Sequence, residues 1–145
     1  MTDDYAHRVQ KFDMCGNYIS QWGSYGTGQG QFRFSGSIAT DSAGNVYVVD
    51  AYNFRIQKFD ANGGFILQWG GTGNNDGEFG SLGPGTIDVD GSDNVFVGDP
   101  SNHRIEIFDS TGSFLTKFGS EGTATASSIG LAALPWIDLI MLYTL

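Results

Sequence analysis

The sequence has few of the residues from which metal centres, disulfide frameworks and nucleic-acid-binding surfaces are built. Its single cysteine, Cys15, excludes an internal disulfide framework and a cysteine-based zinc cluster, because both need several thiols. There are two histidines, whereas a zinc site normally takes three or four protein ligands. Only 7 basic residues stand against 16 acidic ones, which gives a net charge of −9 and a surface that repels phosphate backbones and anionic lipids. We therefore expect no nucleic-acid partner and disfavour a membrane-bound role.

Proline is also scarce, with 3 residues, but glycine is abundant, with 22. Apolar residues at 40% and aromatic residues at 14% exclude a disordered chain, and the many glycines indicate many tight turns. The composition is that of an all-β protein. The first residues have neither the basic start nor the apolar stretch of a secretory signal, so the printed sequence resembles a cytoplasmic protein, although it does not determine the compartment.

One motif occurs three times, with the form Arg, a β-branched residue, Gln or Glu, any residue, Phe and Asp. The copies begin at Arg8, Arg55 and Arg104, which are 47 and 49 residues apart. The two extra residues of the second spacing fall between Phe79 and Ile87. Since loops accept insertions more readily than strands do, we expect a surface loop in that segment.

Four short runs of β-branched and aromatic residues make up the middle repeat, and turns rich in Gly and Asn separate them. The spacing of Ile56 and Phe59 breaks strict alternation, which predicts either a bulge or a strand covered on both faces. A period in the forties with four strands per unit is typical of a β-propeller blade. The strands are expected at residues 37–41, 45–50, 55–60 and 65–69.

The predicted fold is therefore all-β, with blades of four-stranded antiparallel sheets that form an incomplete propeller. The repeat ends after Gly122, and the apolar tail that follows is too short, with interruptions at Pro135 and Asp138, to be a typical membrane span. The expected divisions are a partial blade at 3–23, whole blades at 36–70 and 84–119, and a degenerate apolar tail at 123–145.

The sequence resembles the NHL repeat family over about residues 3 to 122. The likeness rests on Asn53-Phe-Arg-Ile-Gln57, Gly30-Gln-Phe32 and Gly44-Asn-Val-Tyr-Val48, while Ala6, Asp93 and Phe118 depart from the family pattern. The resemblance implies a propeller that usually closes with about six blades, which at roughly 45 residues each would need nearly twice the length of this chain. It therefore implies that the ring is completed by self-association or by further sequence.

Catalytic and metal-binding residues are not indicated. His7 and His103 occupy equivalent repeat positions, so periodicity explains both. Asp50 and Asp99 end predicted strands and could face a channel and bind calcium, as could Asp41 and Asp90. We favour a structural role, in which these carboxylates cap turns and pair with Arg55 or Arg104 across a hairpin. No metal, no cofactor and no catalysis are expected.

The candidate binding residues lie where the second and third strands of each blade are joined. They are Tyr52, Phe54, Arg55, His103 and Arg104. Aromatic residues and arginine are typical contact residues. The two arginines recur, so a role in holding the hairpin explains them, whereas Tyr52, Phe54 and His103 vary between repeats and fit recognition better.

These patterns favour a scaffold that binds a protein or peptide and is not an enzyme. Because fold does not determine function, two alternatives stay open. One is a fragment of a propeller lyase or hydrolase with a metal in its channel. The other, implied by the resemblance, is a fragment of an NHL protein of the ubiquitin-ligase or RNA-binding type, which the acidic charge and the lack of a cysteine-rich zinc module disfavour.

Overall fold

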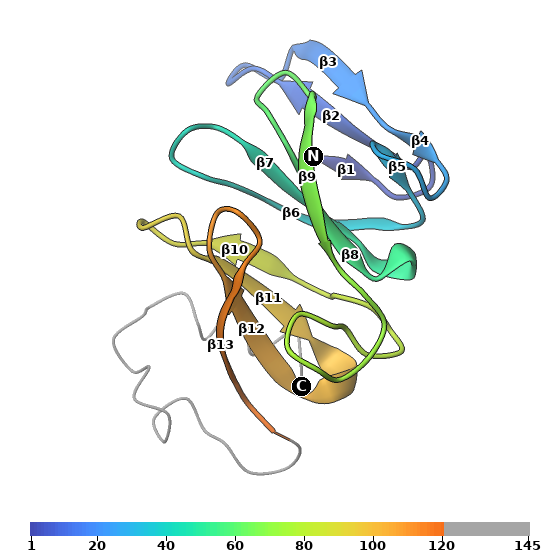
Figure 1. Cartoon of the computed structure of the whole chain (residues 1–145). Helices are drawn as coiled ribbons and strands as arrows, with labels where there is room; N and C mark the ends of the chain where they lie inside the picture. The colour runs from blue at the N-terminus through green and yellow to red at the C-terminus, as the bar shows by residue number, and fades with distance from the viewer. Residues whose placement is uncertain (121–145) are drawn as a thin grey trace.

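The computed structural model describes residues 1–120, which form strands, turns and two short 3-10 helices, with no α-helix in that range (Figure 1). In chain order the elements are β1 (Thr2–Asp3), β2 (Arg8–Phe12), β3 (Tyr18–Trp22), β4 (Ser24–Tyr25), β5 (Gln31–Phe32), β6 (Ser35–Thr40), β7 (Val46–Asp50), η1 (Ala51–Asn53), β8 (Arg55–Phe59), β9 (Phe65–Gly70), β10 (Ile87–Val89), β11 (Val95–Asp99), η2 (Pro100–Asn102), β12 (Arg104–Phe108) and β13 (Phe114–Phe118).

Three antiparallel sheets follow one another along the chain. We call them the first sheet (β1–β3), the second sheet (β6–β9) and the third sheet (β10–β13), and each is a meander in sequence order. The short strands β4 and β5 pair in parallel between the first two sheets. Figure 1 shows the sheets stacked from the blue N-terminal strands to the orange β13. The prediction of four-stranded antiparallel propeller blades is confirmed.

The first sheet contains one strand more than the repeat indicates. The expected partial blade at 3–23 contains β2 and β3, and β1 adds a third strand, in which Thr2 pairs with Val9 and Asp3 with Arg8. This strand is only two residues long, and it corresponds to the end of β7, because Asp3 pairs with Arg8 as Asp50 pairs with Arg55. The predicted tail at 123–145 lies outside the described residues.

Aspartates at strand ends organise the turns, as expected. Asp41 Oδ1 accepts hydrogen bonds from the backbone N–H groups of Ala43 and Asn45, and its Oδ2 accepts one from Asn45 Nδ2 at 2.8 Å. Asp90 and Asn94 repeat this arrangement in the third sheet. Each carboxylate thus satisfies the backbone donors of its own turn, which fixes the hairpin.

The central strand β8 is buried on both faces, and a register irregularity lies between Lys58 and Phe59. Both explanations offered for the Ile56–Phe59 spacing are therefore confirmed. One face packs on the first sheet and the other on the third, because blades stack face to face. Two apolar clusters fill these junctions. The first contains Val9, Phe32, Val46, Val48 and Phe59, and the second contains Tyr47, Val49, Ile56, Val95, Val97 and Phe108.

Tryptophan closes each junction against the turn of the following sheet. The Trp22 ring lies 5.9 Å from the Phe59 ring, and a Cβ at Gly63 would come within 2.7 Å of the indole. Trp69 stands in the same relation to Phe108 and to the turn of the third sheet. Glycine is therefore needed at position 63, where φ is +87° and the indole fills the space above Cα.

The two-residue insertion alters more than a surface loop. In the shorter copy the segment is part of β6, which is irregular between Ser35 and Ile38. In the longer copy it is a turn segment that leaves β10 with three residues. The expected loop is present, with Ser81, Leu82 and Gly85 exposed, but Gly83 and Pro84 within it are buried. Gly83 of this longer segment lies so close to the backbone of Ala51, the first residue of η1, that a Cβ at position 83 would clash with it.

Candidate functional site

The predicted binding residues of the second sheet border one groove of about 460 Å³. It lies at the end of the sheet where β7 turns through η1 into β8, beside the loop that arrives from the first sheet. The groove is lined by Thr27, Tyr52, Asn53, Phe54, Arg55, Gln68, Trp69 and Gly70. The structure thus brings together Tyr52, Phe54 and Arg55.

A left-handed residue shapes this corner in each repeat. Phe54 closes η1 with φ 54° and ψ 42°, and its N–H donates to the Ala51 carbonyl. His103 closes η2 with φ 51°, and His7 has φ 52° at the equivalent position. Since bulky residues rarely adopt this conformation, the hairpin bonds around it must hold it in place.

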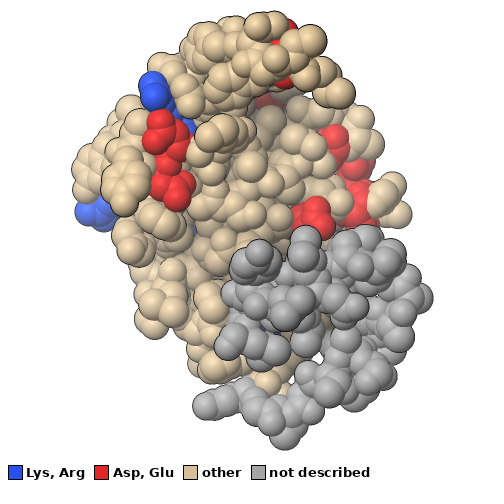
Figure 2. Space-filling model, turned by 180° about the vertical axis from the view of Figure 1, so that it is seen from behind, with Lys and Arg blue, Asp and Glu red and all other residues tan. Residues whose placement is uncertain are grey.

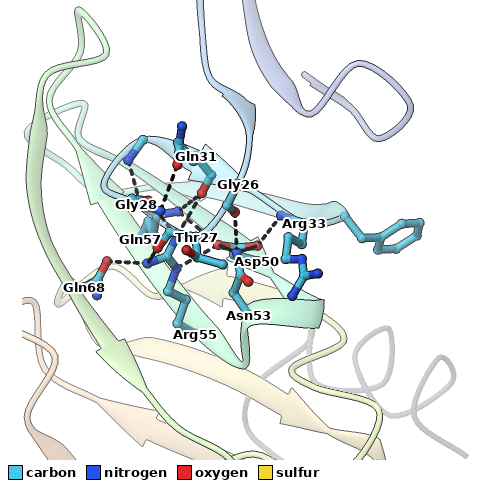
Figure 3. Close-up of polar contacts among 12 residues, drawn as sticks. Gly26, Thr27, Gly28, Gln31, Arg33, Asp50, Asn53, Arg55, Gln57 and Gln68 are labelled. Carbon is cyan, nitrogen blue, oxygen red and sulfur yellow. Dashed lines mark hydrogen bonds and ion pairs between the residues drawn. The ribbon is translucent and has the colours of Figure 1, made fainter.

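Arg55 is the centre of the polar network at the groove (Figure 3). Its Nε donates to the buried carboxylate of Asp50 at 2.7 Å, and its Nη1 donates to Gln68 Oε1 at 2.8 Å. Its remaining donors reach three backbone carbonyls of the incoming loop, at Thr27, Gly28 and Gln31. Because the guanidinium has five N–H donors in a rigid fork, it can tie the loop to the sheet.

Arg104 repeats this arrangement in the third sheet. Its Nε lies 3.3 Å from Asp99 Oδ2, and its Nη atoms donate to the carbonyls of Asn74, Asn75 and Glu78. We call each Arg–Asp pair with its captured loop a clasp. The predicted pairing of Asp50 with Arg55 and of Asp99 with Arg104 is present, and both pairs are buried.

The accessible candidate residues are the aromatic ones. Tyr52 is 63% exposed and Phe54 is half-buried, whereas Arg55 is 8% exposed. His103 is exposed, but it lies on the third sheet with the buried Arg104 and is not part of the groove at Tyr52. The binding role of all five residues stays a prediction, and the structure gives the two arginines a structural role besides.

Three exposed residues that sequence reasoning missed adjoin Tyr52. Phe34 packs its ring 5.4 Å from that of Tyr52, and Tyr25 lies under the Arg33 guanidinium with 5.8 Å between the guanidinium carbon and the ring centroid. His7 links the two pairs, because its ring lies 5.0 Å from Tyr25 and its Nδ1 lies 3.5 Å from the Phe34 nitrogen. We call these five residues the aromatic platform. A comparison of repeats offers the signal that was missed, since Gly80 replaces Arg33 in the next copy.

The carboxylates considered for calcium are occupied by protein donors. Burial favours the neutral form of Asp41, but hydrogen bonds from Asn45 and Tyr47 and the nearby Lys58 ammonium together hold the pKa of Asp41 below its usual value. Lys58 Nζ lies 3.3 Å from Asp41 Oδ2. Within residues 1–120, no group of three or more His, Cys, Asp or Glu side chains is arranged to hold a metal ion. No helix in this range is long and apolar enough to cross a membrane.

Charged groups are distributed unevenly. Figure 2 shows acidic side chains at several places on one face of the molecule, with the basic ones gathered on one side. Most bases are already paired, so the surface available to a ligand is acidic or uncharged over much of its area.

Comparisons with solved structures identify the fold. Virginiamycin B lyase from Staphylococcus aureus, in a crystal structure with quinupristin, matches with a TM-score of 0.61 and 15% identity over 85% of this chain and 38% of the lyase chain. Hydrazine synthase from Kuenenia stuttgartiensis matches with a TM-score of 0.61 and 12% identity over 83% of this chain and 32% of that chain. A Bacteroides caccae protein of unknown function matches with a TM-score of 0.55 and 15% identity over 80% and 40% of the two chains.

This chain therefore spans less than half the length of these structures, and the likeness concerns fold alone. A comparison with curated protein sequences found no match. The sequence profile of the NHL repeat matches residues 32–59, which run from β5 through β8 and include both Asp50 and Arg55. Residues 32–59 are thus an NHL repeat, and the described chain has the fold of part of an NHL-type β-propeller.

Proposed function

We propose that the chain is a binding scaffold, in which propeller blades present one face to a protein or peptide partner and carry out no catalysis of their own. The observation that supports this most directly is the groove beside Tyr52. It combines an exposed aromatic side chain with walls held by the Arg55 clasp. Aromatic anchors on a rigid frame lose little conformational freedom on binding, which favours recognition.

The test is a selection of peptides on the whole chain from a displayed library, followed by affinity measurements on variants. Tyr52→Ser should weaken the selected peptides by about tenfold or more, since removal of an aromatic anchor typically costs 1–2 kcal/mol or more. Leu115→Ser is the matched control, because Leu115 is 51% exposed on β13, away from the groove. Equal losses in both variants, or none, would contradict a binding face at Tyr52.

A second partner is suggested by the first sheet, where the equivalent Asp, Arg and Gln are present but Arg8 donates to no loop carbonyl within residues 1–120. Asp3, Arg8 and Gln10 stand 47 residues before Asp50, Arg55 and Gln57. Arg8 pairs with Asp3 at 3.0 Å and donates to Gln21, yet its side chain is 34% exposed, against 9% for Arg55. We propose that this side takes the loop of a blade from a second copy, so that self-association extends the propeller.

Light scattering of the purified chain tests this partner. A discrete dimer that Arg8→Glu converts to monomer would support it, because the reversed charge repels Asp3 and offers no donor to a loop carbonyl. Lys117→Glu, at an exposed ion pair with Asp76, controls for the change of net charge. A monomeric wild-type chain would exclude self-association through Arg8.

The enzyme alternative draws on the similar structures, two of which are a lyase and a synthase. Their distance from this chain leaves catalysis unassigned, and we propose none. Titration with Mg²⁺, Mn²⁺ and Zn²⁺ by calorimetry separates the two functions. Tight binding of one equivalent would favour a fragment of a metal-dependent propeller enzyme, and its absence agrees with the scaffold. Nucleic acid is not a proposed partner, and salt-sensitive binding of RNA would overturn that view.

A further inference from the structure

The aromatic platform is a continuous exposed surface at the junction of the first two sheets. Tyr25 contacts both His7 and Arg33, Phe34 packs against Tyr52, and the long hydrogen bond from the Phe34 N–H to His7 Nδ1 joins the two groups. Tyr25 is 61% exposed, Phe34 42% and Tyr52 63%. Aromatic side chains this accessible make the platform a place where a ligand can bury apolar area.

The fold does not require these side chains. The backbone N–H of Arg33 donates to Asp50 Oδ1 at 2.8 Å, and in the next repeat the N–H of Gly80 donates to Asp99 Oδ1 at 3.0 Å. The structural task at this position is therefore performed equally well by a residue with no side chain. The other platform positions change too, since Thr72 stands for Tyr25 and Ser101 for Tyr52.

Phe34 is held in an unfavourable backbone conformation. Its φ is +68°, which bulky residues seldom adopt, and the chain on either side is fixed by hydrogen bonds from Ala51 N–H to the Phe34 carbonyl and from Tyr52 N–H to the Arg33 carbonyl. The strain keeps an aromatic ring at the surface beside Tyr52. Strained residues of this kind gather at binding sites, where they fix side chains before the ligand arrives.

Arg33 is unusual among the basic residues, all of which lie in the described part of the chain. Five of the seven form ion pairs with carboxylates there, and Lys11 donates to the Ala61 carbonyl. Within residues 1–120, the polar contacts of the Arg33 guanidinium are with Tyr25, at 3.4 Å from its hydroxyl oxygen and over its ring. In Figure 3 no dashed line joins the Arg33 guanidinium to Asp50 or to another labelled residue. An unpaired guanidinium in a chain with a net charge of −9 offers a site for an anion.

We propose that the aromatic platform binds an extended peptide segment in which a Glu or Asp carboxylate pairs with Arg33 while flanking aromatic side chains pack on Tyr25 and on the Phe34–Tyr52 pair. This inference rests on the proposed function and names the chemistry of its partner. The guanidinium supplies the charge and paired donors that a carboxylate accepts, and its ring neighbours keep water from one side of the contact. The acidic surface elsewhere repels the peptide, so the carboxylate is directed to the Arg33 guanidinium, which forms no ion pair within residues 1–120.

The test uses two blocked hexapeptides that contain two Phe residues around a central Glu or, in the control peptide, a central Gln. Binding to the whole chain is measured by calorimetry, and the ¹⁵Nε signal of Arg33, assigned with Arg33→Lys, is followed by NMR. We expect the Glu peptide to bind about tenfold more tightly than the Gln peptide and to shift the Arg33 signal. Equal affinities, an unmoved Arg33 signal or no binding of either peptide would overturn the proposal.

Variants separate this inference from the general binding role. Arg33→Gln should remove the preference for the Glu peptide while leaving weak binding of both peptides. Lys117→Gln, the control, should change neither the affinities nor the preference. Because Gly80 fills the same backbone position, Arg33→Gln is expected to fold normally. Suppose that the library peptides lose affinity in Tyr52→Ser, contain no acidic residue and bind Arg33→Gln as tightly as the wild type. The proposed scaffold function would then be retained, and the carboxylate site at Arg33 would be rejected.

Discussion

The second and third sheets hold their incoming loops with the same Arg–Asp clasp, but they differ at the residue two positions after the arginine, which contacts the same loop. In the second sheet, Gln57 Nε2 donates to the Gln31 carbonyl at 2.8 Å and to Asp50 Oδ2 at 3.1 Å, and its Oε1 accepts from the Gly30 N–H at 2.9 Å. In the third sheet the equivalent residue is Glu106. An amide fits this place because it is both donor and acceptor, whereas an ionised carboxylate can only accept.

Glu106 keeps the acceptor half of this arrangement. Its Oε1 accepts from the Gly77 N–H at 3.3 Å and lies 2.9 Å from Arg104 Nη2, but its buried Oε2 has no hydrogen-bond partner within residues 1–120. Burial raises the pKa of Glu106, and Asp99 raises it further, while Arg104 and the Gly77 N–H only partly offset this. The clasp of the third sheet is therefore weakened by the additional buried carboxylate of Glu106, where the second sheet has the amide of Gln57.

The largest effect is expected from removing the clasp arginine. Arg55→Met leaves Asp50 as a buried charge without its partner and releases three loop carbonyls, so the free energy of unfolding should fall by about 3–5 kcal/mol. Urea denaturation followed by tryptophan fluorescence measures this. Arg8→Met is the matched control, because its half-exposed pair with Asp3 should contribute less than about 1 kcal/mol. Similar losses in the two variants would show that the captured loop adds nothing.

The second-largest effect on stability is expected from exchanging the amide of Gln57 and the carboxylate of Glu106. Glu106→Gln restores a donor where Oε2 is unpaired and should raise the free energy of unfolding at pH 7 by about 1–2 kcal/mol. Gln57→Glu should lower it by a similar amount, since it introduces the same defect in the second sheet. The two variants are measured by the same urea titration. If Glu106→Gln is neutral or destabilising, the buried carboxylate is better accommodated than its contacts indicate.

The difference between these forms should depend on pH. Because the pKa of Glu106 is raised in the folded chain, its contribution is fully present below the unfolded value and is lost as pH rises through the folded value. Glu106→Gln should therefore match the wild type near pH 4 and be more stable at pH 7. Comparison of the two chains cancels the opposite effect of Asp41 and Asp90, whose lowered pKa values cost stability as pH falls. A constant difference between pH 4 and 7 would rule out titration of Glu106.

The smallest effect concerns the first turn of each sheet. Asp93 replaces the Gly44 of the second sheet, takes φ +62° and accepts hydrogen bonds from the N–H and hydroxyl of Ser42. Asp93→Ala keeps the strained conformation and removes these bonds, so it should destabilise the chain by about 1 kcal/mol. Asp93→Asn, which retains an acceptor and tolerates this φ, should lose less. Thermal unfolding resolves the pair, and an equal loss in both would mean that the bonds to Ser42 need the charge.

Sequence reasoning reached the strands, the blades and the Asp–Arg pairs because each leaves a periodic signal. It could not find the carbonyl contacts of Arg55, since backbone acceptors have no residue type and any loop of suitable shape supplies them. The aromatic platform was missed for the opposite reason. Arg33 and Phe34 do not recur, and their contacts arise only when residues from the first and second sheets meet. The repeat pattern thus predicts the residues that every blade needs, but it does not predict the residues that occur at only one junction.

The clasp arginines bind main-chain carbonyls of their loops and, within residues 1–120, make no hydrogen bond to the loop side chains. Arg55 grips Thr27 and Gly28, while Arg104 grips Asn74 and Asn75, and the two loops share little sequence beyond glycine. Mutations can therefore accumulate in these loops without loosening the blades. The blade junctions therefore combine a recurring mode of loop attachment with loop side chains that can differ from one junction to the next.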